Sequence, residues 1–235
     1  MGSSKLPSKT SSDNVQKFLS KVAAAPVRNK AGEKGRLIFA LDATASRQPA
    51  WDRACHLQGE MFQETAALGG LEIQLAYYRG FGEFRASPWT AESDTLLRQM
   101  SAVFCLAGET QIRKVLQHAV NESKKHAVNA LIFVGDCVEE DIDKLGAIAG
   151  ELGLLGVPAF VFHEGRDPMA EFAFKQIATL TNGAYCRFDA ASAQTLRELL
   201  RAVAVYAAGG RLALEDFARK KGGAVLQIAH QIKRG

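Results

Sequence analysis

The sequence has little of what would place it in a specialised class of protein. No apolar stretch approaches the roughly 20 residues that a membrane-spanning helix needs. The N-terminal residues MGSSKLPSKTSSDNVQ contain no apolar segment like that of a secretory signal. The four cysteines are far apart and form no C-x-x-C pair, so they support neither a disulfide framework nor a zinc site. We therefore expect a cytoplasmic protein whose thiols are reduced and mostly buried.

Charge is present in ordinary amount but is unevenly placed along the chain. The 235 residues are 47% hydrophobic and 23% charged, which is typical of a soluble domain with a substantial core. Residues 1–36 contain eight Lys or Arg and two Asp or Glu, residues 211–235 contain six and two, and the segment between them contains 15 and 21. The body is therefore acidic and its ends are basic. Because the basic residues are sparse, we interpret the ends as solvated and do not expect nucleic-acid binding.

From residue 36 onward, the hydrophobic pattern alternates between that of strands and that of helices. Continuous apolar runs at 36–41, 129–136 and 157–165 predict strands that are covered on both faces. The segments 71–79 and 82–87, joined by a glycine-containing turn, predict a hairpin. A sixth strand is expected at 184–189, and helices are expected at 49–68, 87–100, 110–125, 139–153, 168–183 and 192–208.

Strands that alternate with helices pair mostly in parallel, with the helices on both faces of the sheet. The sequence therefore predicts a Rossmann-like, doubly wound α/β fold. Its six-stranded sheet would be mostly parallel, with one antiparallel edge strand contributed by the hairpin.

We assign residues 35–208 to this single domain. Residues 1–34 are expected to form a flexible basic leader, with a possible short helix at 13–25. Residues 209–235 are expected to form a basic tail of two helical segments, separated by Gly222 and Gly223. The sequence does not fix the oligomeric state.

Three loops carry oxygen-bearing side chains at positions that this fold would bring together. Asp42, Thr44 and Ser46 follow the first strand, Thr110 precedes a helix, and Asp136 ends the fourth strand. Ligands of open, doubly wound sheets bind beyond the carboxyl ends of the strands. Each residue also has an ordinary explanation, since Asp is a common turn former and Thr110 could cap its helix. Five oxygen donors in three convergent loops nevertheless favour a binding site.

The motifs D-x-[ST]-x-S, Gly-x-Thr and a final Asp, in this order, resemble the metal-ion-dependent adhesion site of von Willebrand factor type A domains. The resemblance covers about residues 36–206. It implies a site for Mg²⁺ or Mn²⁺, which prefer oxygen ligands. By this resemblance the direct ligands would be Thr44, Ser46 and Thr110, and the residues acting mainly through water would be Asp42 and Asp136.

The resemblance also implies what the site does. An ion held by neutral hydroxyls stays electrophilic toward one further oxygen, typically a carboxylate of another protein. The expected function is therefore non-enzymatic: a metal-dependent protein–protein interaction module whose partner presents an Asp or Glu.

The chain departs from the family pattern near the expected site. The family usually has [ST]-D-G at the fourth strand, whereas this chain has Gly135, Asp136 and Cys137. Glu109 adds a negative charge beside Thr110. We assign Glu109 and Cys137 to the rim of the partner-binding surface.

Two alternatives remain open. The first is a structural domain of the same type whose metal site no longer functions. The second is a cysteine hydrolase of the isochorismatase type, in which Asp42, Lys114 and Cys137 would act together. That reading leaves Thr44, Ser46 and Thr110 unexplained. A dinucleotide-binding fold is disfavoured because the first turn, DATASRQ, contains no glycine.

Overall fold

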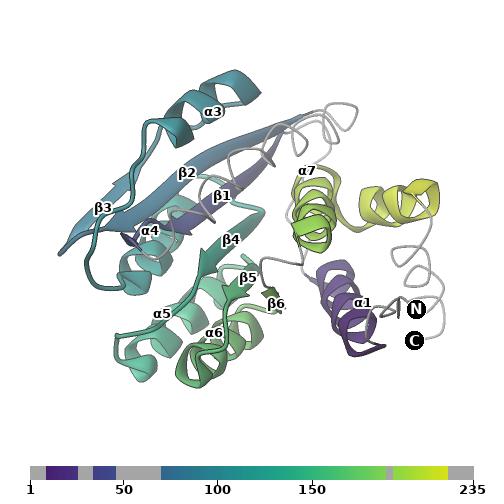
Figure 1. Cartoon of the computed structure of the whole chain (residues 1–235). Coiled ribbons are helices and arrows are strands. Elements are labelled where there is room, and N and C mark those ends of the chain that lie inside the picture. Colours follow the sequence, from purple (N-terminus) through teal and green to yellow (C-terminus); the bar gives the residue numbers. More distant parts are fainter. Residues whose placement is uncertain (1–8, 26–33, 46–69, 189–192, 222–235) are drawn as a thin grey trace, which may run out of the picture.

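A six-stranded sheet with helices on both faces forms the centre of the molecule (Figure 1). The computed structural model describes residues 9–25, 34–45, 70–188 and 193–221. The strand order is β3-β2-β1-β4-β5-β6, and every neighbouring pair is parallel except β2 and β3. This confirms the predicted mostly parallel sheet with one antiparallel edge strand. The strands are β1 (Gly35–Asp42), β2 (Leu71–Arg79), β3 (Glu83–Ala86), β4 (Ala130–Gly135), β5 (Ala159–Glu164) and β6 (Ala184–Phe188).

The helices divide between the two faces of the sheet. The buried side chains of α4, α5 and α6 form one hydrophobic cluster with one face, and those of α1, α3 and α7 form another with the opposite face. The helices are α1 (Lys9–Ala24), α3 (Ser93–Ser101), α4 (Ile112–Lys125), α5 (Ile142–Leu154), α6 (Pro168–Leu180) and α7 (Ala193–Lys221).

Strand β1 is apolar along almost its whole length because both of its faces are covered. Successive side chains point to opposite faces of a sheet, so Leu37 and Phe39 belong to one cluster and Ile38 to the other. This is the pattern of a central parallel strand. It also fixes the place of Asp42, which is the last residue of β1 and lies at the carboxyl edge of the sheet.

The helix predicted at 87–100 begins later than expected. Its first six residues run beside β2, where Ile73 and Thr90 exchange two backbone hydrogen bonds of 2.8 and 3.0 Å. The helix starts only at Ser93. Pairing with the sheet therefore outweighs the helical spacing of this segment, and that part of the prediction is wrong.

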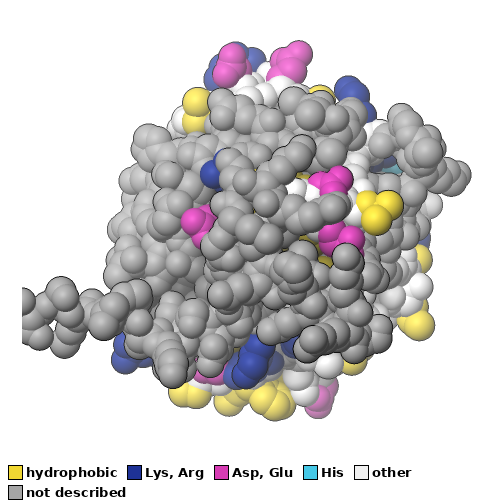
Figure 2. Space-filling model, turned by 90° about the vertical axis from the view of Figure 1, so that its right-hand side faces the viewer, with side chains coloured by type: hydrophobic (Ala, Val, Ile, Leu, Met, Phe, Trp, Pro, Cys, Tyr) yellow, Lys and Arg dark blue, Asp and Glu magenta, His cyan; other side chains and the backbone are white. Residues whose placement is uncertain are grey.

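Helix α1, which lies within the predicted leader, packs against the body. Its Phe18 is buried, with its ring centroid 6.1 Å from that of Phe160 and 5.2 Å from that of Phe162. Beside it, α7 continues past residue 208 and bends at Gly210, where φ is 67°. Seen from the side on which α1 and α7 lie, basic and hydrophobic side chains of the described residues adjoin each other along the lower border (Figure 2).

Some expectations fall outside the described residues, namely the helix at 49–68, the last tail helix and Ser46. Within the described residues, none of the helices has both the length and the apolar character needed to cross a membrane.

Candidate metal centre

The predicted site residues lie where the strand order reverses. From β1 the chain goes to β2 on one side and later to β4 on the other, and β1 pairs in parallel with both. Asp42 ends β1, and Asp136 directly follows the last residue of β4. Ligands of open α/β sheets bind beyond the carboxyl ends of the strands at such a point, so a crevice between loops is expected at this edge.

Asp42 is a buried carboxylate held by neutral donors. It is 1% exposed. Its Oδ1 accepts from the backbone N–H of Thr44 at 2.8 Å, and its Oδ2 accepts from the hydroxyl of Tyr78 at 2.9 Å. Burial raises the pKa of Asp42, hydrogen bonds from Thr44 oppose that rise, and the nearby charge of Asp136 adds to it. The described protein groups around Asp42 therefore compensate the negative charge of its carboxylate only in part.

Tyr78 is a site residue that sequence reasoning missed. It lies on β2 as the direct partner of Asp42 in the sheet register and is fully buried. Burial, followed by the charge of Asp42, raises the pKa of Tyr78 well above its ordinary value. The phenol therefore stays protonated and holds the carboxylate in one orientation.

The second loop reaches the site through a close backbone approach. Leu106 N–H donates to Ala43 C=O at 3.0 Å, and Glu109 N–H donates to Gly80 C=O at 3.3 Å. A Cβ on Gly108 would lie 2.1 Å from the oxygen of Gly80. The glycine of the Gly-x-Thr motif is thus required for the loop to pass over the β2–β3 turn.

Thr110 joins the second loop to the third. Its backbone N–H donates to Glu139 Oε2 at 2.8 Å, and the backbone N–H of Glu139 donates to Thr110 Oγ1 at 3.0 Å. This reciprocal pair fixes the hydroxyl of Thr110, which is 5% exposed. The Thr110 hydroxyl also hydrogen-bonds the side chain of Glu140, which leaves one lone pair of Oγ1 for another partner.

The suggestion that Thr110 caps helix α4 is wrong. The N-cap position is Gln111, whose side chain makes no capping hydrogen bond. Glu140, from the loop after β4, accepts from the free backbone N–H groups of Ile112 and Arg113 instead. Burial raises the pKa of Glu140, and these backbone bonds oppose the rise.

The third loop places Cys137 among carboxylates. Burial, followed by the charges of Asp136 and Asp42, raises the pKa of Cys137 to about 12. A thiol with so high a pKa is a poor nucleophile at neutral pH. Lys114 donates to Gly82 C=O at 2.6 Å and to Gln111 Oε1 at 2.8 Å. These features count against the cysteine hydrolase.

No protein-family model matches the sequence, and no curated protein matches it either. Solved structures are similar to it in three dimensions. The von Willebrand A domain of SpRpn10 has a TM-score of 0.57 at 13% identity, covering 72% of this chain and 94% of that one. A von Willebrand factor type A protein from Catenulispora acidiphila has a TM-score of 0.59 at 16% identity, covering 73% and 43%. An aerotolerance-related membrane protein from Bacteroides fragilis has a TM-score of 0.54 at 16% identity, covering 71% and 98%.

The chain has the von Willebrand factor type A fold. At these identities the likeness extends to the fold alone. Whether this von Willebrand A fold fits a metal ion must therefore be judged from its own side chains.

The oxygen donors of this von Willebrand A fold suit Mg²⁺ chemically. Among the described residues, no group of three or more His, Cys, Asp and Glu side chains is placed to hold a metal ion. The hydroxyls would therefore have to contribute, as the sequence predicts. Thr44 hydrogen-bonds Asp42 through its side chain, and Asp136 lies close enough to affect the ionisation of Asp42. Such a mixture of hydroxyl and carboxylate oxygens is what a hard cation prefers.

An exposed apolar rim lies beside the three loops that carry Asp42, Thr110 and Asp136, which we call the acidic loops. It consists of Phe81 in the β2–β3 turn and of Phe104 and Leu106 in the loop that leads to Thr110. Phe81 is 82% exposed and Phe104 is 57% exposed. The guanidinium of Arg79 lies 4.2 Å from the ring centroid of Phe104 and donates to its carbonyl at 2.9 Å. Phe104 is therefore held in place although it faces solvent, and no motif pointed to this rim.

Proposed function

We propose that this chain is a protein-interaction module that binds Mg²⁺ or Mn²⁺ at the carboxyl edge of β1 and β4 and uses the ion to hold an acidic side chain of a protein partner. The observation that carries the proposal is the buried carboxylate of Asp42. The donors to its two oxygens are Thr44 and Tyr78, both neutral. A divalent cation would supply the missing positive charge.

The charges of the loops support a role for the metal in partner binding. Asp42, Asp136, Glu139 and Glu140 all lie in or beside the three loops. A partner carboxylate would be repelled by so many negative charges. A bound divalent ion dominates its immediate field and would reverse this repulsion locally.

The ligands we propose are the predicted ones. Thr44, Ser46 and Thr110 would hold the ion through their hydroxyls, with Asp42 and Asp136 acting mainly through water. Ser46 lies outside the described residues. Glu109 is exposed and Cys137 is half-buried, which suits residues at the rim of a contact surface.

The apolar rim tells us what else the partner should present. Aromatic side chains that remain exposed next to a polar site are typical of protein-binding surfaces. We therefore expect the partner's Asp or Glu to be flanked by apolar side chains that cover Phe81, Phe104 and Leu106. We further propose that the protein works in the cytoplasm and is not an enzyme.

Metal binding is tested by calorimetric titration of the full chain with Mg²⁺ and Mn²⁺. At a metal concentration of 100 times Kd, a folded-state ligand adds about 2.7 kcal/mol to the free energy of unfolding. Asp42→Asn and Thr44→Val should abolish both the heat of binding and this added stability. Asp94→Asn, an exposed carboxylate on α3, is the control and should change neither.

If metal at millimolar concentration gives no heat and no added stability in the wild type, the chain is a structural domain without a working site. If metal binds, affinity capture of partners with Mg²⁺ and with chelator tests the second half of the proposal. A partner retained equally well in chelator would refute metal-dependent docking.

A further inference from the structure

Strand β6 is the last strand of the sheet, and its outer edge faces α1 (Figure 1). Within the described part of the chain, β6 pairs with β5 alone. The outward-facing N–H and C=O groups of such an edge form a template for one more strand. Proteins commonly cover, shorten or charge an edge of this kind, so its surroundings show what it is built to accept.

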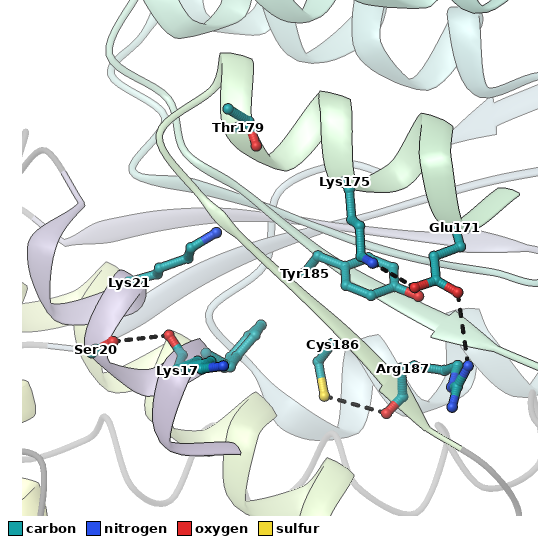
Figure 3. Close-up of a pocket in the computed structure, with 10 residues that line it drawn as sticks. Lys17, Ser20, Lys21, Glu171, Lys175, Thr179, Tyr185, Cys186 and Arg187 are labelled. Atoms are coloured by element: carbon teal, nitrogen blue, oxygen red, sulfur yellow. Dashed lines mark hydrogen bonds and ion pairs between the residues drawn. The ribbon is translucent and has the colours of Figure 1, made fainter. Parts of the chain in front are cut away.

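A cavity of about 460 Å³ follows this edge between α1 and α6 (Figure 3). Three consecutive residues of β6, Tyr185, Cys186 and Arg187, line it. Successive side chains of a strand point to opposite faces. Tyr185 accordingly points toward α6, and Cys186 points toward the α1 side (Figure 3). The cavity therefore wraps around the edge of the strand and does not lie on one face of it. We call it the edge groove.

Positive charge lies on both sides of the edge groove. Lys17 and Lys21 come from α1, and Lys175 and Arg187 lie on the α6 side. Among the described residues that line it, the one carboxylate is Glu171, which pairs with Lys175 and lies 3.7 Å from Arg187. Lys17 and Lys21 are both exposed. Four basic side chains against one carboxylate give these lining residues of the edge groove a net positive charge.

We propose that the edge groove binds an acidic, extended segment of a protein partner, which adds to the sheet as a strand beside β6. Main-chain hydrogen bonds to the edge would supply affinity, as in other cases of strand addition. An extended segment directs alternate side chains to opposite faces. Its carboxylates would therefore meet Lys17 and Lys21 on one face and Lys175 on the other.

The chain's own ends have the wrong charge to be this occupant. Residues 222–235 contain two basic residues and no acidic one, and residues 1–8 contain one Lys and no acidic residue. Both would be repelled by the lysines of the edge groove. An acidic segment from another protein fits the charge, and it requires no metal, so this inference is independent of the proposed metal centre.

The test uses a fluorescein-labelled peptide of eight residues, in which each pair of Glu residues is followed by a Val and a Thr. Its binding to the full chain is followed by fluorescence anisotropy in chelator, which silences any metal site. Charge reversal of two lysines, Lys17→Glu with Lys21→Glu, should weaken binding by about tenfold or more. The matched control, Lys124→Glu with Lys144→Glu on α4 and α5, makes the same change in net charge and should leave the affinity within about twofold.

Strand addition is separated from simple charge attraction by a second peptide. It has the same sequence but is N-methylated at alternate residues, so that it keeps its charge and cannot complete a ladder of hydrogen bonds. We expect it to bind at least about tenfold more weakly. Equal binding of both peptides would overturn the proposal, and so would failure of the first peptide to bind at millimolar concentration.

Amide hydrogen exchange gives a readout at the edge itself. The unmodified peptide should slow exchange in residues 184–188 and leave the amides of β3, at the opposite edge of the sheet, unchanged. Unchanged exchange in 184–188 at saturating peptide would place the contact elsewhere and would also overturn the proposal.

Discussion

The molecule has two charged regions of opposite sign that are built in different ways. The acidic loops at the carboxyl edge hold buried side chains, such as Asp42 and Thr110, which are fixed by hydrogen bonds of 2.8 to 3.0 Å. The edge groove is lined by long, exposed lysines on α1 and α6. Interactions of the buried kind resist salt and depend on geometry, whereas those of the exposed kind are screened within about 8 Å at physiological salt. One fold thus supports a geometrically demanding site and a tolerant one.

The first prediction removes a wall of the edge groove and spares the acidic loops. Phe18 on α1 is buried against Phe160 and Phe162. Phe18→Ala should lower the free energy of unfolding by about 3–5 kcal/mol, because it deletes a buried aromatic ring. Chemical denaturation measures the loss. In Phe172→Ala, which truncates a Phe that is 54% exposed, we expect a change within about 0.5 kcal/mol.

In the absence of denaturant, and at a temperature where Phe18→Ala is still folded, the metal affinity of this variant should equal that of the wild type. A parallel loss of metal affinity would mean that the two regions do not behave independently.

The second prediction perturbs the acidic loops and spares the edge groove. Gly108→Ala would place a Cβ 2.1 Å from the backbone oxygen of Gly80, where no flexible side chain can move aside. We expect a cost of about 1–3 kcal/mol in the free energy of unfolding, together with weakened metal binding. Gly150→Ala on α5 is the control, because a Cβ there meets nothing within 4 Å. If calorimetry finds an unchanged metal affinity in Gly108→Ala, the loop that contains Gly108 does not contribute to metal binding.

Much of the fold could be predicted because its signals are local. Continuous apolar runs identify β1, β4 and β5, and the hairpin of β2 and β3 follows from its glycine-containing turn. The convergence of the acidic loops then follows from the topology. Residues 87–92 were predicted incorrectly because their backbone pairs with β2, and a helical spacing of side chains carries no sign of such pairing.

Parts of the site could not be predicted because they depend on distant contacts. Tyr78 reaches Asp42 only through the register between β1 and β2. Glu139 and Glu140 accept hydrogen bonds from backbone N–H groups at and just before the start of α4, which lie 27 to 29 residues away in the sequence. From the sequence alone, these two glutamates are typical of an exposed acidic turn. The ligand set itself remains a prediction that metal titration must test.

The last prediction concerns His163, which links the two regions and has the smallest expected effect. His163 is fully buried at the end of β5. Its Nε2 lies 3.2 Å from the carbonyl oxygen of Asp136, and its Nδ1 lies 2.9 Å from the hydroxyl of Tyr185 in the edge groove. A carbonyl oxygen can only accept, so in the neutral ring Nε2 carries the proton and Nδ1 accepts from Tyr185.

Burial lowers the pKa of His163, although the bond to Asp136 and the charges of Glu171 and Asp167 oppose the shift. In the unfolded chain a histidine takes up a proton near pH 6.5, while the folded protein keeps this ring neutral. Unfolding therefore binds a proton below that pH, and the contribution of His163 to stability is lost as the pH falls through 6.5. Denaturation curves at pH 7.5 and 5.5 should show a larger loss of stability for the wild type than for His163→Gln, which has no titrating ring.

Other groups change stability over the same range, so the difference between the two proteins is the informative quantity. Burial also lowers the pKa of His118, while it raises the pKa of Asp42 and of Glu140. These groups are present in both proteins and cancel in the comparison. If wild type and His163→Gln lose the same stability between pH 7.5 and 5.5, then His163 is protonated equally in the folded and unfolded chains. A larger loss in the wild type would mean that the folded protein keeps the ring of His163 neutral below the pH at which the unfolded chain protonates it.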